Sequence, residues 1–297
     1  MKPTSGQKVF GVFNAGFMLV FCILCIYPVV FVIALSFNDG VDAMRGGIYL
    51  WPRVWSLENY RTILKENRIV TSALISIYRT VAGASLAMLL NACFAYALTK
   101  RDLPGRRVFT WLILVPMYFS GGIIPYFLVC KSLGLVNTLL VYVLPAIFVP
   151  FYILLIRVAL LAMPASLEES AKLDGAGYGT IFLRIYFPLS GPILATVALL
   201  SGIGHWNDWF DGTVMVLTSR LWPLQTLLLH TIQGADIMSF FKKRNIAMTG
   251  SYLKKSKITV ESLKMAMLVL TVAPVVLLYP FLQRYFIKGI MLGSLKG

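Results

Sequence analysis

The sequence predicts an all-α integral membrane protein with six transmembrane helices. Hydrophobic residues make up 58% of the 297 residues, charged residues only 13%, and the mean hydropathy is +0.79. Several apolar runs exceed the roughly 20 residues that a helix needs to cross the ~30 Å hydrocarbon core of a bilayer. One soluble domain could not bury six such segments in its core, so a soluble protein is excluded.

The six predicted spans are apolar runs separated by polar segments. The first has no charged residue between Val9 and Asn38. It is too long for the apolar region of a signal peptide and is not followed by a cleavage site of small residues, so we expect it to be retained. Pro116, the Ser120-Gly121-Gly122 stretch and Pro125 interrupt the third, which predicts broken backbone satisfied by protein or a wet cavity. The expected spans cover residues 11–37, 69–98, 108–129, 133–161, 191–217 and 261–286 of a single transmembrane domain, residues 1–297.

Arg79 lies inside the second predicted span, where a charge is a functional candidate by default. Residues 80–98 can nearly cross the bilayer on their own, however, so the guanidinium could extend to the membrane boundary instead. The sequence favours this second interpretation.

A polar stretch, residues 164–189, lies between the fourth and fifth predicted spans and contains a short helix. Ser166 and Glu169 have the spacing of a capping box, in which each side chain accepts a hydrogen bond from the other residue's backbone N–H. Pro164 ends the preceding helix, and Gly175 can close the short one in a left-handed conformation. We therefore expect a helix of about eight residues that projects from the membrane towards a partner.

The distribution of cations predicts which side of the membrane this loop occupies. Six spans place both termini on one side, and the positive-inside rule assigns that side to the cytoplasm. Its cations are Lys2, Lys8, those of residues 100–107, Arg284, Lys288 and Lys296. The loop of residues 164–189 then faces the cytoplasm too.

One outer segment departs from the positive-inside rule. Its six cations are Lys242, Lys243, Arg244, Lys254, Lys255 and Lys257. On the outer side they could attract an acidic polysaccharide or dock an acidic protein surface. A solvated loop without preference is the alternative.

The sequence gives an enzyme little support. It contains no G-x-x-x-x-G-K-S/T loop, so we do not expect this chain to hydrolyse ATP by that device. His205 and His230 lack the spacing of metal ligands, and no nucleophile elbow is present. We expect no metal and no cofactor in this chain.

The loop of residues 164–189 resembles the signature of permease subunits of ATP-binding cassette importers. That signature reads E-A-A, three residues, Gly, nine residues, then I-x-L-P. The chain has Glu169-Ser170-Ala171, Gly175 and Ile185-Tyr186-Phe187-Pro188 at the same spacing, with departures at Ser170 and Phe187. Further segments are similar to the carbohydrate branch of the family, so that the resemblance covers nearly the whole chain. They are SGGIIP at residues 120–125, HWNDWF at 205–210, PLQTL at 223–227 and the terminal GSLKG.

The resemblance implies the type I importer permease fold and several partners. These are a second, homologous permease that completes a heterodimer, two cytoplasmic ATPases that hold ATP and Mg, and an extracytoplasmic solute-binding protein. The chain would lie in the bacterial cytoplasmic (inner) membrane and would not bind nucleic acid.

The resemblance also implies residues for two contacts with the ATPases. The first contact is a coupling helix in an ATPase cleft, with Glu168, Glu169, Ser170, Ala171, Asp174 and Gly175. The second is the tail, with Gly293, Lys296 and Gly297. Glu169 has two compatible interpretations, a contact with the ATPase or a cap of its own helix. Asp174 fits a helix-ending turn better than a partner contact.

A cluster near the end of the fifth predicted span is the best candidate for the solute path. It consists of His205, Trp206, Asn207, Asp208 and Trp209. Trp rings stack on sugar faces, and Asn and Asp form hydrogen bonds with hydroxyls. The two Trp residues could instead belong to the aromatic belt of the membrane interface. Because Asp208 would repel an anionic solute, it could pair with a nearby cation instead.

Within the carbohydrate branch the chain is most similar to permeases for complex or acidic saccharides such as alginate or pectin fragments. The resemblance therefore implies half of the translocation path of an ATP-driven importer for an acidic oligo- or polysaccharide. A neutral oligosaccharide is the alternative solute. A self-sufficient secondary transporter is a second alternative, but it needs ionisable residues deep in the spans and often an internal repeat. A membrane enzyme would need a nucleophile or metal set that the sequence does not offer.

Overall fold

The computed structural model describes residues 4–233 and 258–294, with side chains of the last helix up to Leu278. This part of the chain is helical and contains no strand, although Asn38 and Trp55 form an isolated β-bridge. It divides into two compact units, Met1–Ile69 with Leu228–Ala273 and Val70–Leu227 with Pro274–Gly297. The all-α prediction is confirmed, whereas the single transmembrane domain stays a prediction.

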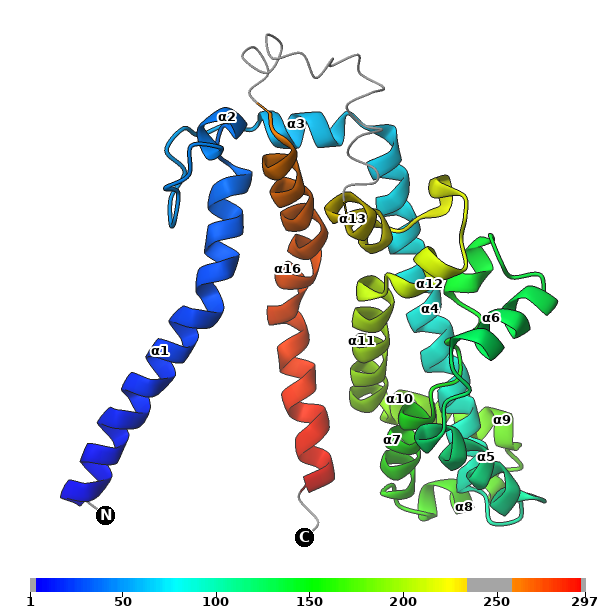
Figure 1. Cartoon of the computed structure of the whole chain (residues 1–297). Helices are drawn as coiled ribbons and strands as arrows, with labels where there is room; N and C mark the ends of the chain where they lie inside the picture. The colour runs from blue at the N-terminus through cyan, green and yellow to red at the C-terminus, as the bar shows by residue number, and fades with distance from the viewer. Residues whose placement is uncertain (1–3, 234–257, 295–297) are drawn as a thin grey trace. The chain divides into compact units, whose positions relative to one another are not determined.

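The first unit begins with the long helix α1, Ser5–Ser36, followed by α2, Gly40–Ala43, and α3, Glu58–Leu64 (Figure 1). Thr4 starts α1 with a capping box, because its hydroxyl accepts from the N–H of Gln7 and the Gln7 side chain accepts from the N–H of Thr4. The first predicted span is therefore helical over nearly its whole length.

Asn59 on α3 joins the ends of two long helices of the first unit. Its amide nitrogen donates to the carbonyls of Ser36 and Asn38, both at 3.0 Å, directly after α1. Its amide oxygen accepts from the Ser262 hydroxyl at 2.9 Å, near the start of α16, Val260–Ser294. Because Asn59 and Ser262 are buried, these bonds satisfy groups that would otherwise be costly to bury.

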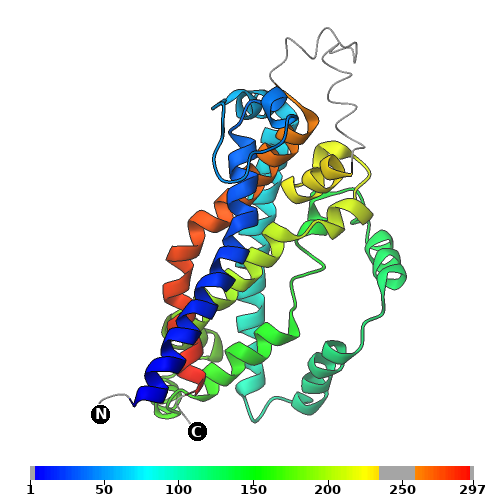
Figure 2. The same cartoon turned by 60° about the vertical axis from the view of Figure 1, so that its left-hand side comes forward.

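Helix α4, Asn67–Thr99, matches the second predicted span. The third is broken at the Ser120-Gly121-Gly122 stretch, as expected, whereas Pro116 and Pro125 lie inside helices and do not interrupt them. It forms α5, Arg106–Tyr118, and α6, Ile123–Ser132, with a non-helical stretch at residues 119–122 between them (Figure 2). Gly122 has a φ of 84°, which a residue with a side chain rarely adopts.

The fourth predicted span, residues 133–161, is not one continuous helix. Residues 133–149 contain only the short 3₁₀ turn η1, Leu139–Tyr142, and helix α7 begins at Pro150 and ends at Leu161. Left-handed backbone at Gly134 and Asn137 interrupts the helix, and Pro145 cannot donate to it. An apolar run is thus not sufficient to predict a helix through these residues.

The chain bends sharply twice in the later part of the second unit. After α7 come α8, Ser166–Leu173, then α9, Tyr178–Ile181, a π-helical turn over Phe182–Tyr186 and α10, Phe187–Leu189. The fifth predicted span forms α11, Gly191–Asn207, and α12, Phe210–Val214. A 3₁₀ turn, Ser219–Leu221, and α13, Leu224–Ile232, follow. The bends are 77° between α7 and α8, and 80° between Tyr178–Leu189 and Gly191–Val214.

Three described helices are long and apolar enough to cross a membrane. They are Gly6–Ser36, Asn67–Thr99 and Val260–Leu278, and the number rises to five if each bent pair of helices is one span. Membrane-spanning helices are thus supported for the described residues, and the count of six spans stays a prediction.

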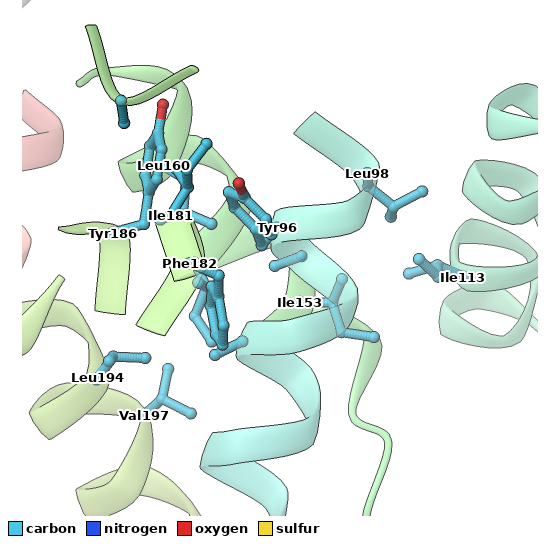
Figure 3. Close-up of a cluster of buried hydrophobic side chains, with 14 residues drawn as sticks. Tyr96, Leu98, Ile113, Ile153, Leu160, Ile181, Phe182, Tyr186, Leu194 and Val197 are labelled. Carbon is cyan, nitrogen blue, oxygen red and sulfur yellow. The ribbon is translucent and has the colours of Figure 1, made fainter. Parts of the chain in front are cut away.

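Aromatic side chains form the centre of the largest core cluster of the second unit (Figure 3). Tyr96 of α4 packs against Phe182 and Tyr186, with ring centroids 5.1 and 5.2 Å apart. Ala171 of α8 belongs to the same cluster, and Val197 of α11 is completely buried in it. The core therefore ties the short helix α8 to two much longer ones.

Candidate functional site

Helix α8 has the predicted length, but not the predicted capping box. The helix starts after Ala165, whose backbone is already helical, and no side chain caps it. The carbonyl of Ala165 accepts from the N–H groups of Glu168 and Glu169 at 3.0 and 3.1 Å, while Ser166 lies inside the first turn. The side chain of Glu169 does not serve as a cap and is exposed.

Glu168, not Glu169, is the partly buried acid of the loop. Its carboxylate accepts from Lys100 Nζ at 2.5 Å, from Lys172 Nζ at 3.0 Å and from the Tyr186 hydroxyl at 3.2 Å. The side chains of Glu168 and Lys100 are only 17% and 11% exposed. Burial raises the pKa of the Glu168 carboxyl, but the hydrogen bonds from the two lysines outweigh this effect and hold it below its usual value.

Lys100, directly after α4, lies among aromatic rings. Its Nζ is 3.9 Å from the ring centroid of Tyr96, 5.2 Å from that of Tyr186 and 5.5 Å from that of Tyr178. The Tyr178 hydroxyl in turn donates to Asp102 at 2.7 Å. Cation–π contacts and a desolvated ion pair therefore join α8 to the end of α4 and to the start of α9.

Helix α8 turns one face inward and one outward. Ala171 packs into the core, while Glu169, Ser170 and the C-cap residue Asp174 are exposed. Gly175 follows with a φ of 77°, which confirms the predicted left-handed turn.

Leu173 is the residue of this outer face that sequence reasoning missed. Its side chain is 89% exposed although leucine is apolar. A helical repeat places it four residues after Glu169 on the face opposite Ala171, so the signal was present in the sequence. An isolated exposed leucine is common on protein surfaces, and only its place on this short helix makes it a candidate contact.

The other two predicted surfaces are largely outside the described residues. Gly293 lies within α16, while Lys296 and Gly297 are not described. All six outer cations, Lys242, Lys243, Arg244, Lys254, Lys255 and Lys257, also lie outside the described residues.

The prediction that Arg79 extends to the membrane boundary is wrong. Its side chain is 1% exposed and forms an ion pair with Asp208 at 2.5 Å, with Asp211 next at 3.8 Å. A second nitrogen donates to the carbonyl of Asp208 at 2.7 Å, and the guanidinium lies 4.7 Å from the ring centroid of Tyr142. The two carboxylates and the Tyr142 ring offset the cost of burying the guanidinium. Asp208 therefore pairs with a cation, as proposed from the sequence.

This ion pair lies at the break between α11 and α12. Helix α11 ends at Asn207, and the backbone of Asp208 is extended. The Asp208 carboxylate also accepts from the N–H of Phe210 at 3.0 Å, in the first turn of α12. Tyr126 of α6 donates to Asp211 at 2.9 Å. Sequence reasoning missed Tyr126, Tyr142 and Asp211, because no local pattern indicates contacts between such distant residues.

The remaining candidates for the solute path differ in exposure. His205 is buried opposite Gly83, where a Cβ would overlap its imidazole ring. Asn207 is exposed and accepts from the Gln225 amide at 3.3 Å, Trp206 is half-buried, and Trp209 is 47% exposed. Their contact with a solute stays a prediction.

A cavity of about 530 Å³ adjoins this segment in the second unit. Phe210 and Tyr126 line it from α12 and α6, and most of its other residues come from the break in the third predicted span. The complete lining is Ser120, Gly121, Gly122, Ile123, Pro125, Tyr126, Val129 and Phe210. The structure therefore brings the two broken spans together around one cavity.

Comparisons with known proteins agree on a family. Residues 70–291 match a sequence model described as "Binding-protein-dependent transport system inner membrane component". The polygalacturonan/rhamnogalacturonan transport system permease protein YtcP of Bacillus subtilis (strain 168) is 37% identical, over 98% of this chain and 99% of that protein. Protein LplC of the same organism is 34% identical, over 100% and 98%.

A solved structure is similar over almost the whole length. The crystal structure of a bacterial ABC transporter involved in the import of the acidic polysaccharide alginate matches with a TM-score of 0.87 and 30% identity. The match covers 96% of this chain and 99% of that one. The arabinooligosaccharides transport system permease protein AraQ of Halalkalibacterium halodurans is 29% identical over 100% of both chains.

Proposed function

The chain belongs to the family of binding-protein-dependent transport system inner membrane components, and we propose that it forms half of the translocation path of an ATP-driven importer for acidic oligo- or polysaccharides. Membership makes it a permease of the ATP-binding cassette type and a non-enzymatic membrane subunit. A second permease, two cytoplasmic ATPases holding ATP and Mg and an extracytoplasmic solute-binding protein would complete the importer. Both termini and α8 would lie on the cytoplasmic side.

The similarity to relatives named for polysaccharides supports the choice of solute. One relative is named for polygalacturonan and rhamnogalacturonan, and the similar crystal structure belongs to an importer of the acidic polysaccharide alginate. The arabinooligosaccharide relative favours a neutral oligosaccharide as the second candidate.

The observation that carries the coupling proposal is the attachment of α8. Its Glu168 is bound to Lys100 at the end of α4 and to Tyr186 of the segment that leads into α11. A movement of α8 would therefore be transmitted to both of those helices as a rigid-body displacement. ATP could drive it only by favouring one of two states of the permease.

Uptake should depend on ATP hydrolysed by partner subunits. We would reconstitute the permease with its sister permease, ATPases and solute-binding protein in liposomes, and supply labelled oligogalacturonate, oligoalginate or arabinooligosaccharide. We expect accumulation only with ATP and Mg inside, and at least tenfold faster for an acidic solute than for the neutral one. Uptake by the permease without ATPases would contradict the coupling, and a preference for the neutral oligosaccharide would contradict the choice of solute.

Leu173→Asp should separate the ATPases from the permease without unfolding it. Because the Leu173 side chain is 89% exposed, replacing it costs the isolated chain little stability. An ATPase cleft that binds α8 would, by contrast, have to bury the charge of the new aspartate. We expect at least tenfold less ATPase to co-purify, with unchanged permease in the membrane. Leu57→Asp, which changes a leucine 54% exposed outside the loop, is the matched control. Equal ATPase recovery for both variants would exclude Leu173 from the contact.

A further inference from the structure

We propose that Asp208, Asp211 and Tyr126 form a joint around the buried side chain of Arg79 that holds the breaks of the third and fifth spans in one arrangement, and that Arg79 is a positioning residue for transport. We call these four residues the Arg79 joint. The inference rests on the proposed function for its transport readout, while the joint itself is defined by contacts within the second unit.

Arg79 binds the chain at the point where the helix stops. One guanidinium nitrogen donates to the Asp208 carbonyl at 2.7 Å and another to the Asp208 carboxylate at 2.5 Å. The carbonyl end of a helix carries partial negative charge, so a cation is favoured there. The same carboxylate accepts from the N–H of Phe210, which starts the next helix. Arg79 and Asp208 thus satisfy backbone groups on both sides of the break.

The arrangement of these bonds requires the break. In a continuous helix the Asp208 carbonyl would accept from the N–H four residues later, that of Gly212. It would then be turned along the helix axis and away from α4, and Arg79 would lose one of its two bonds. The Arg79 joint therefore distinguishes a broken fifth span from a straight one, as a two-state element must.

Asp211 and Tyr126, the other two residues of the Arg79 joint, connect the third span to the break of the fifth. Asp211 accepts from Tyr126 at 2.9 Å and lies 3.8 Å from Arg79. Tyr126 lies in the first turn of α6, directly after the break at residues 119–122, and lines the cavity with Phe210. A second hydrogen bond joins the segment after α6 to the segment after α12, because the Asn137 side chain accepts from the N–H of Thr218 at 3.0 Å. A displacement of α12 would therefore move α6.

Burial of the Arg79 charge is costly, while the side chains of its partners Asp208 and Asp211 are 30% and 14% exposed. Arg79 is 1% exposed, and its Nε has no hydrogen-bond partner among the described residues. Apolar residues of similar volume often stabilise a core as well as a buried ion pair or better. An ion pair with directional hydrogen bonds, by contrast, fixes one arrangement of the two breaks. Packing between apolar surfaces would allow more than one arrangement.

The test uses the complete importer in liposomes with two conservative variants. Arg79→Lys keeps the charge but cannot offer the planar fork that reaches carbonyl and carboxylate together. Tyr126→Phe removes only the hydroxyl bonded to Asp211. The matched control is Tyr118→Phe, which changes a tyrosine 81% exposed on α5. Initial uptake rate, solute KM, ATP hydrolysed per solute moved and the amount of assembled complex are measured for each.

We expect Arg79→Lys to lower the maximal uptake rate at least tenfold and Tyr126→Phe at least threefold, with KM within twofold of the parent. The amount of ATP hydrolysed per solute molecule should rise, because the ATPases still hydrolyse ATP while the permease changes conformation less often in response. A structural role alone would lower uptake and assembled complex in proportion, leaving that ratio unchanged. This outcome, or parental uptake by both variants, would overturn the proposal. ATP-independent uptake by the parent would instead contradict the proposed function. In that case the uptake rates of the variants relative to the parent would still test whether the Arg79 joint is needed for transport.

Discussion

Glu168→Ala is expected to cause the largest loss of stability of any single change in the loop of residues 164–189. The substitution leaves Lys100, whose side chain is only 11% exposed, without its carboxylate partner. Removing one member of a fully buried ion pair typically costs about 3–5 kcal/mol, because the remaining charge stays desolvated. Because Lys100 and Glu168 are 11% and 17% exposed, we expect the lower end of this range. For a chain of this size such a loss lowers the melting temperature by about 10 °C. Uptake should fall at least tenfold, since α8 loses its ion pair with Lys100 at the end of α4 and keeps only its apolar contacts with that helix.

Two further variants separate this role from a contact with the ATPase. Glu169→Ala removes the neighbouring carboxylate on the same helix, but this one is exposed, so the melting temperature of the purified permease should change little. In the double variant Glu168→Leu with Lys100→Met both charges are gone, and most of the lost stability should return. Equal losses for Glu168→Ala and Glu169→Ala, or no recovery in the double variant, would contradict the assignment of Glu168 as the partly buried anchor.

The loop illustrates what local sequence patterns can predict. The length of α8 and the turn at Gly175 were predicted correctly, because both depend on residues that are neighbours in the chain. The capping box was not, because Ala165 already has helical backbone and the first turn is satisfied without Ser166. Which of two adjacent glutamates turns inward depends on Lys100, 68 residues away, and no local pattern contains that information.

The Arg79 joint illustrates the same limit at greater distance. An arginine in an apolar run indicated an unusual position, but its hydrogen bonds reach a residue 129 positions further along the chain. Asp208 was expected to pair with a cation on chemical grounds alone, and this expectation was correct. The identity of the cation, and the involvement of Tyr126 and Asp211, required the tertiary structure. The interruption of the third span was predictable at Gly122, whose positive φ is a local property of glycine, whereas Pro116 and Pro125 lie inside helices.

Gly212→Ala is expected to disrupt the break of the fifth span through a clash with Thr226. A Cβ at this position would lie 2.9 Å from Cβ of Thr226 and even nearer to its hydroxyl. Thr226 is completely buried and branched at Cβ, so it cannot turn away. It would have to move and release the carbonyl of Trp209, to which it donates at 3.1 Å. Overpacking of this kind costs about 1–3 kcal/mol, and we expect at least a tenfold loss of uptake.

A second glycine provides the control for helix propensity. Gly202 also lies in a helix, α11, and a Cβ there would meet Thr80 and Ala84 at 3.8 and 3.9 Å, which is ordinary contact. Alanine favours a helix over glycine by about 1 kcal/mol at either position, so the difference in melting temperature between Gly202→Ala and Gly212→Ala isolates the clash. Adding Thr226→Ala to Gly212→Ala removes the nearest atom and should recover part of the stability and uptake. If Gly212→Ala is as stable and active as Gly202→Ala, close packing between residues 212 and 226 does not hold the break.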